Sequence, residues 1–168
     1  SYSELKNWVK CSYYHKLLHL DKSIPYSSNQ FACFGTAIHT ACENMLLCRK
    51  KDKNKNYSNG LRDFSRKFKT ELLKNKIEID KKEVKELTEQ AKNIIFNFKT
   101  EMINKFGKDY EVCGVEELLK EDIEDTDFQF KGYVDAIIKS NNTYYVIDFK
   151  STSWGWTSSR KSDKLTTY

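Results

Sequence analysis

The chain has 168 residues, of which 39% are hydrophobic and 32% are charged, and its formal net charge is +5. This length and composition predict one soluble globular domain with a core of its own. The longest apolar runs are too short to cross a bilayer, and no secretory leader opens the chain, so we expect neither a membrane span nor export.

The five cysteines show no Cys-x-x-Cys spacing, which predicts neither a zinc site nor a disulfide framework. A reducing, cytoplasmic setting is therefore expected. The positive charge is a modest indication of a polyanionic partner.

The first two thirds of the chain predict helices. Apolar residues recur at helical spacing over residues 4–20, 34–47, 61–76 and 82–106. Residues 21–30 contain the single proline and predict a loop, and the basic, asparagine-rich stretch 49–60 predicts a mobile connection within the fold. The side chains expected on the apolar faces are Leu5, Trp8, Val9, Leu17 and Leu18; Ile38, Ala41, Cys42, Met45 and Leu46; Phe64, Phe68 and Leu72; and Ala91, Ile94, Ile95, Phe98 and Met102.

The last third changes to β-branched and aromatic runs. These predict strands over residues 110–119, 128–138 and 143–149. The pair Asn141-Asn142 predicts the turn of a hairpin between the last two strands. Helices that precede such strands predict an α/β fold, a small mixed β-sheet flanked by helices, formed as one domain over residues 1–168.

The predicted hairpin carries two carboxylates and a lysine. Asp135 ends one apolar run, whereas Asp148 and Lys150 stand two residues apart and project from the same face of the next strand. That face must border a cleft, because a bare carboxylate or ammonium is too costly to bury. Carboxylate oxygens bind hard cations such as Mg²⁺ or Mn²⁺, and a lysine stabilises negative charge. The pattern predicts phosphodiester hydrolysis, with Asp135 and Asp148 as metal ligands and Lys150 beside the attacking water; solvated strand ends are the alternative.

This arrangement resembles the PD-(D/E)XK nuclease superfamily, and within it the RecB-type branch. In that branch a Gly-x-x-Asp strand precedes an Asp/Glu-x-Lys strand, and here these motifs run from Gly132 to Asp135 and from Asp148 to Lys150. The segment Phe-Gly-Thr-Ala-Ile-His at residues 34–39 is similar to the branch's Gly-x-x-x-His element, and residues 3–14 resemble its opening helix. The resemblance implies a restriction-endonuclease-like core.

The resemblance also implies roles for two further residues. His39 would be a further metal ligand, although a lone histidine on a helix is more often structural. Glu116, which follows a short apolar run, would reach toward the metal; a surface position is the alternative. His15 and His19 are four residues apart on the first helix, and we expect them to face DNA or solvent.

Cys11 corresponds to the first ligand of an iron–sulfur cluster in some members of that superfamily. The remaining ligands would come from a cysteine-rich segment beyond Tyr168, and the other four cysteines stand elsewhere. We therefore expect a buried thiol at Cys11 and no iron–sulfur cluster in this chain. Because the family continues with a helix and a strand, we also expect a chain truncated at its C-terminus.

The segment after Lys150 predicts contacts with nucleic acid. Small hydroxyls bond phosphate oxygens, indoles stack on bases and cations attract the backbone. The family's Gln-x-x-x-Tyr element is also expected here, with lysine in place of its glutamine. The candidate nucleic-acid-binding residues are Thr152, Trp154, Trp156, Arg160, Lys164 and Tyr168. Burial of the two tryptophans in the core is the alternative.

The expected function is that of a Mg²⁺- or Mn²⁺-dependent deoxyribonuclease. The resemblance implies DNA as the substrate, an exonuclease more often than an endonuclease, and work in recombination, repair or processing of phage or mobile-element DNA. It also implies a helicase or recombination protein as a partner, and it says nothing of the oligomeric state. The main alternative is a catalytically silent DNA-binding module or partner-dependent subunit; a basic helical adaptor would leave the acidic hairpin unexplained.

Overall fold

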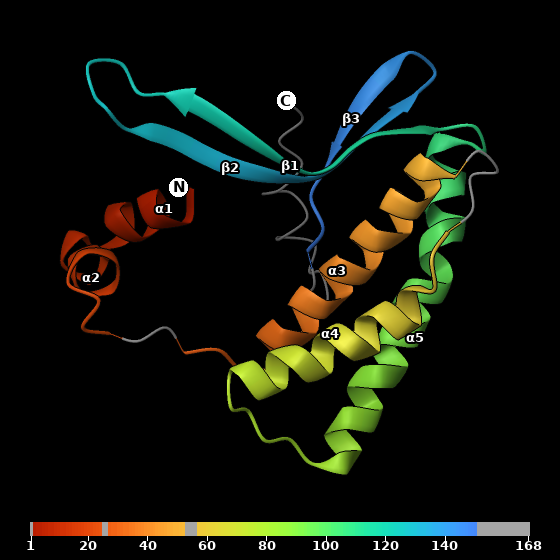
Figure 1. Ribbon diagram of the computed structural model, residues 1–168, viewed down its shortest axis with the longest axis horizontal. Coiled ribbons are helices and arrows are strands. Elements are labelled where there is room, and N and C mark those ends of the chain that lie inside the picture. The colour runs from red at the N-terminus through yellow and green to blue at the C-terminus, as the bar shows by residue number, and fades with distance from the viewer. Residues whose placement is uncertain (1, 25–26, 53–56, 151–168) are drawn as a thin grey trace.

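A computed structural model describes residues 2–24, 27–52 and 57–150, and it confirms the predicted α/β fold (Figure 1). Helices occupy the first two thirds of the chain and strands the last third. The elements are α1 (Tyr2–Lys10), α2 (Ser12–His15), the π-helical turn η1 (Lys16–Leu20), α3 (Gln30–Lys51), α4 (Gly60–Lys74), α5 (Lys81–Phe106), β1 (Glu111–Asp122), β2 (Gln129–Ser140) and β3 (Thr143–Ile147).

The sheet has three strands in the order β1-β2-β3, and all pairing between them is antiparallel, whereas a mixed sheet was expected. Asn141 and Asn142 both have positive φ angles, 46° and 64°, as the two central residues of a tight hairpin turn require. The turn joins β2 to β3 and pairs Ser140 with Thr143. The Asn-Asn hairpin was therefore predicted correctly.

The core lies on both sides of α3, which packs against α4, α5 and the sheet. One cluster of buried side chains joins α3 to α4 and α5, and the other joins the C-terminal halves of α3 and α5 to β1 and β2. The expected apolar stripe of α3 is buried throughout, which confirms that prediction. Phe98 and Phe149 pack against both clusters, so the segment after β3 is anchored to the helices. Among the described residues, no helix has both the length and the hydropathy that a membrane span requires.

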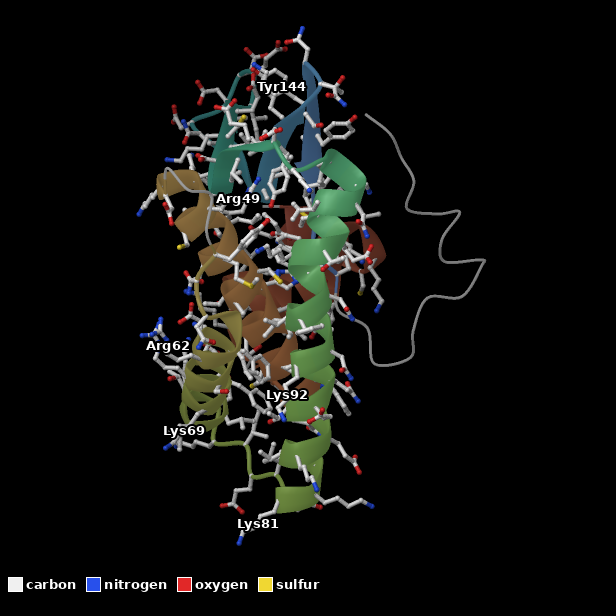
Figure 2. The ribbon with its side chains drawn as sticks, turned by 90° about the vertical axis from the view of Figure 1, so that its right-hand side faces the viewer. Arg49, Arg62, Lys69, Lys81, Lys92 and Tyr144 are labelled. Atoms are coloured by element: carbon white, nitrogen blue, oxygen red, sulfur yellow. The ribbon has the colours of Figure 1, made fainter. Side chains whose placement is uncertain are left out.

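Helix α3 is longer at both ends than the sequence indicated. It begins at Gln30 because the side chain of Asn29 accepts a hydrogen bond from the backbone N–H of Ala32 at 2.9 Å. It continues to Lys51 because Arg49 is buried: its guanidinium lies 4.0 Å from the ring centroid of Tyr110 and donates to the Tyr110 carbonyl at 3.3 Å. Residues 49–51 thus belong to α3 and not to the predicted connection, and Arg49 lies where the helices meet the sheet (Figure 2).

The predicted first helix, residues 4–20, is wrong in two respects. Cys11 has extended backbone angles, and its Sγ accepts a hydrogen bond from the Tyr14 N–H at 3.4 Å, so it ends α1 and caps α2. Cys11 is exposed, as are Leu5, Trp8 and Val9, which were expected on a buried face. The reason is that residues 2–20 pack mostly on themselves, and their main contact with the rest of the described chain is between α1 and β2.

We predict that Asn29→Ala lowers stability by about 1 kcal/mol, because it leaves a donor at the start of α3 without its cap. For a chain of this size the melting temperature should fall by about 2–4 °C. Thermal unfolding followed by circular dichroism checks this. Asn93→Ala, an exposed position inside α5, is the matched control and should not destabilise. Equal melting temperatures for parent and Asn29→Ala would show that the cap does not fix the start of α3.

Candidate metal centre

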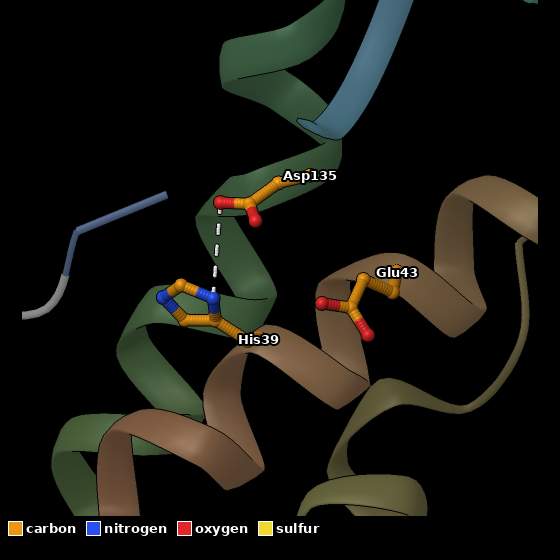
Figure 3. A group of neighbouring side chains, drawn as sticks. All are labelled: His39, Glu43 and Asp135. Carbon is orange, nitrogen blue, oxygen red and sulfur yellow. Dashed lines mark ion pairs between the residues drawn. The ribbon is translucent and has the colours of Figure 1, made fainter. Parts of the chain in front are cut away.

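Helix α3 and strand β2 bring three potential metal ligands together. His39 and Glu43 are one helical turn apart on α3 and so share one side of it. Asp135 approaches them from β2 (Figure 3). One ligand atom from each of the three side chains lies within 4.8 Å of the others. A nitrogen and two carboxylate oxygens at this separation are a donor set suited to a divalent cation.

Asp135 is held in this position by the segment that follows β3. Its Oδ2 accepts a hydrogen bond from the backbone N–H of Phe149 at 2.5 Å and lies 3.8 Å from Nδ1 of His39. The Phe149 ring packs edge-on against the His39 ring, with centroids 6.0 Å apart. The same ring also contacts Phe98 on α5. These contacts join the predicted Gly-x-x-Asp strand, the Asp-x-Lys segment and the histidine helix at one point.

The electrostatics of the cluster favour a cation. Burial, and then the negative charges of Glu116 and Asp135, raise the pKa of Glu43 to about 7. Crowded carboxylates repel one another unless a proton or a cation lies between them. The residues present therefore fit the divalent ion that the sequence motifs imply.

Asp148 and Lys150 lie beside this cluster in sequence but are not part of it. The Asp148 side chain is 64% exposed, and its carboxylate forms an ion pair with the ammonium of Lys150. Because Phe149 between them packs toward the helices, the two polar side chains project together, as their spacing predicted. Strand β3 ends at Ile147, one residue before Asp148. Their predicted roles as ligand and lysine of the site stay predictions.

Glu116 and Glu43 complete the acidic surroundings. Glu116 is exposed and has a positive φ of 54° within β1, and it is close enough to Glu43 to raise its pKa. Sequence reasoning missed Glu43. The signal was present, because a carboxylate one helical turn after His39 has to project from the same side of the helix.

Other predicted site residues lie elsewhere. The expectation that His15 and His19 are solvated is wrong, because His15 is bonded to Glu4 and His19 to Asn7, and all four residues are at least half-buried. The alternative, that they face DNA, stays a prediction. The predicted nucleic-acid-binding residues lie outside the described part of the chain; they are Thr152, Trp154, Trp156, Arg160, Lys164 and Tyr168.

Comparison with known proteins gives one match. The family model of the PD-(D/E)XK nuclease superfamily matches residues 1–168. No curated protein and no solved structure matches the chain. The match extends over both α3 and β2, which carry the cluster described above.

We predict that Glu43→Gln changes the pH dependence of stability in the metal-free protein. A carboxyl whose pKa is raised from 4.5 to about 7 on folding binds a proton more tightly in the folded state. Its contribution to stability is therefore complete below pH 4.5 and declines as the pH rises through the folded-state pKa. Glu43→Gln should remove this decline.

Urea unfolding in EDTA between about pH 4.5 and 7.5 measures the effect, since ionisation of this group changes within that window. Glu101→Gln, which removes an exposed carboxylate from α5, is the control and should keep the parent's pH profile. A Glu43→Gln profile parallel to that of the parent would contradict the crowding of carboxylates at this site.

Proposed function

We propose that this chain, which belongs to the PD-(D/E)XK nuclease superfamily, is a metal-dependent deoxyribonuclease of the RecB-type branch. The observation that carries the proposal is the hydrogen bond from the Phe149 N–H to Asp135. It sets the carboxylate of one motif against the backbone of the other, beside His39 and Glu43. Members of the superfamily are generally nucleases, and Asp135 and His39 of this cluster are the residues that its motifs place here.

His39, Glu43 and Asp135 would hold the divalent ion, Mg²⁺ or Mn²⁺. When bound, such an ion polarises a phosphate and lowers the pKa of water. The hydrogen bond from Phe149 fixes the orientation of Asp135, and the packing of Phe149 on His39 restricts the imidazole ring. The ligand side chains are thus positioned before any ion arrives, which reduces the entropy lost on binding.

Asp148 and Lys150 would complete the site when substrate binds. Their ion pair is exposed, and such pairs contribute only about 0–1 kcal/mol, so exchanging it for contacts to a cation and a phosphate costs little. The Asp148 carboxylate would then join the acidic cluster. The Lys150 ammonium, a compact charge on a long stem, would neutralise negative charge that develops on the phosphate.

We infer an exonuclease that works in recombination, repair or processing of phage or mobile-element DNA, with DNA as substrate and a helicase or recombination protein as partner. The resemblance of the ordered motifs to the RecB-type branch supports this inference. The five free cysteines support a cytoplasmic protein, because thiols persist in a reducing compartment.

A catalytically silent DNA-binding module is the second candidate. It is favoured by the position of Asp148, whose carboxylate pairs with Lys150 and lies outside the cluster. The two candidates differ in a direct assay. The proposed enzyme degrades labelled DNA with Mg²⁺ or Mn²⁺ and stops in EDTA, whereas the silent module binds DNA and releases no product under either condition.

We predict that Asp148→Ala lowers cleavage by orders of magnitude and leaves the fold intact. The reason is loss of a metal ligand at an exposed position that contributes no packing. Release of labelled nucleotides, together with a thermal melt, checks both parts. Glu101→Ala removes an exposed carboxylate from α5 and should keep parent activity. Near-parent cleavage by Asp148→Ala would remove the motif's second carboxylate from the mechanism.

We predict that His39→Ala weakens metal binding and cleavage, with partial rescue by excess Mn²⁺. Imidazole suits Mn²⁺ better than Mg²⁺, so the parent should prefer Mn²⁺ and the variant should lose that preference. Activity measured against the concentration of each metal, with thermal melts, checks this, and Thr40→Ala on the same helix is the control. A lower melting temperature with an unchanged preference for Mn²⁺ would show that His39 only packs.

A further inference from the structure

The N-terminal unit, residues 2–24, presents aromatic rings to solvent. Trp8 is 55% exposed and Tyr13 is 66% exposed, and Tyr14 is also exposed. Three such rings within one short helical unit are a concentration of apolar surface that soluble proteins usually reserve for a binding site.

Four polar side chains of the unit, those of Glu4, Asn7, His15 and His19, are partly buried against one another, whereas its rings are exposed. His15 Nε2 lies 3.2 Å from a carboxylate oxygen of Glu4, and Asn7 is bonded to His19 at 3.1 Å. The two histidine rings stack with their centroids 5.1 Å apart. This internal network fixes α1 against α2 and η1, so the outward positions of Trp8, Tyr13 and Tyr14 are a consequence of how the unit folds.

The charges of the unit favour a polyanion. Its four lysines are Lys6, Lys10, Lys16 and Lys22, and its two acids are Glu4 and Asp21. Glu4 is bonded to His15, and Asp21 lies 4.0 Å from Lys16. Among the described residues no ion pair forms at Lys6 or Lys10, which are exposed on the same helix as Trp8. Lys6 and Lys10 are four residues apart and share one side of α1, whereas Trp8 projects from the opposite side, so the unit carries exposed rings and exposed positive charge on different sides of this helix.

The unit also contacts the strand that leads to the proposed active site. Helix α1 contacts β2, the strand that carries Asp135 (Figure 1). Negative charge gathers where β2 begins, because the end of β1 and the β1–β2 loop carry five carboxylates that repel a phosphate backbone. They are Glu121, Asp122, Glu124, Asp125 and Asp127.

We propose that the N-terminal unit binds single-stranded DNA, with Trp8, Tyr13 and Tyr14 stacking on bases and Lys6 and Lys10 contacting phosphates. The proposal rests on the proposed function for the identity of the substrate. Bases inside a duplex have no free face for a ring to stack on, whereas an unpaired base has two. Exposed rings in a unit that also carries exposed lysines therefore favour a single strand and tolerate any sequence.

The test measures binding of the full chain to fluorescein-labelled oligo-dT and to a duplex of equal length, by anisotropy in EDTA. We expect tighter binding to oligo-dT. Trp8→Ala and Tyr13→Ala should each weaken it roughly five- to tenfold or more, the loss of one stacked base. Trp8→Phe and Tyr13→Phe keep a ring and should restore most of the affinity. Phe96→Ala removes a ring that is 83% exposed on α5, and it should bind like the parent.

A second pair of variants tests the charges without touching the packing. Lys6→Ala and Lys10→Ala should each reduce the salt dependence of oligo-dT binding by roughly 0.7 in the log–log slope. Lys81→Ala and Lys85→Ala on α5 are the controls, and Lys81 lies at the end of the molecule far from the sheet (Figure 2).

The outcomes separate this proposal from the nuclease itself, because binding in EDTA requires no cleavage. Parent-like oligo-dT affinity of a Trp8→Ala/Tyr13→Ala double variant, or tighter binding of the parent to duplex, overturns the proposal even if the enzyme cleaves DNA. Weakened binding of the alanine variants supports it even if no cleavage is found. If the chain has no affinity for oligo-dT and instead binds another protein through these rings, the rings belong to a protein interface and the proposal is overturned.

Discussion

The hydrogen bond from the Phe149 N–H to Asp135 is the contact on which the candidate site depends. It joins β2 to the segment after β3, and the Phe149 ring packs against both core clusters. The polar half of this arrangement positions a carboxylate, and the apolar half prevents the segment from moving away. Phe149 thus contributes both to the site and to the packing of the core, so the position of Asp135 depends on the packing around α3.

The carboxylates around this site lower the free energy of unfolding. Three carboxylates, those of Glu43, Asp135 and Glu116, are close enough that burial and mutual repulsion raise the pKa of Glu43 to about 7. A fold that only had to be stable would separate these groups, because crowded like charges weaken the folded state. The surrounding packing of α3 against α4, α5 and the sheet overcomes that cost. Carboxylates that repel one another beside an imidazole are the arrangement that an ion-binding site requires, because a bound cation relieves the repulsion.

Sequence reasoning succeeded where hydrophobic spacing decides the structure and failed where polar side chains do. The stripe from Ile38 to Leu46 and the Asn141-Asn142 turn follow from periodicity and backbone preference alone. The N-terminal unit could not be predicted in this way, because its histidines pair with Glu4 and Asn7 and leave Trp8 exposed. Glu43 was overlooked because a single glutamate on a helix is usually a solvated charge; only Asp135, distant in sequence, gives it a role.

Strand β2 runs from the acidic β1–β2 loop to the candidate metal centre. The first half of β2 pairs with the end of β1, and the two strands form an arm whose tip carries the five carboxylates. Helix α1 also contacts β2. Further along, β2 carries Asp135, which belongs to the cluster with His39 and Glu43. A polyanion that approached from the arm would meet five negative side chains before reaching the site. Approach along the N-terminal unit meets lysines and rings instead, and the positive potential of the lysines acts over about 10 Å at about 0.1 M salt. On the proposal that the N-terminal unit binds a single strand, these charges would direct the strand past α1 and along β2 toward Asp135, which accepts a hydrogen bond from the Phe149 N–H.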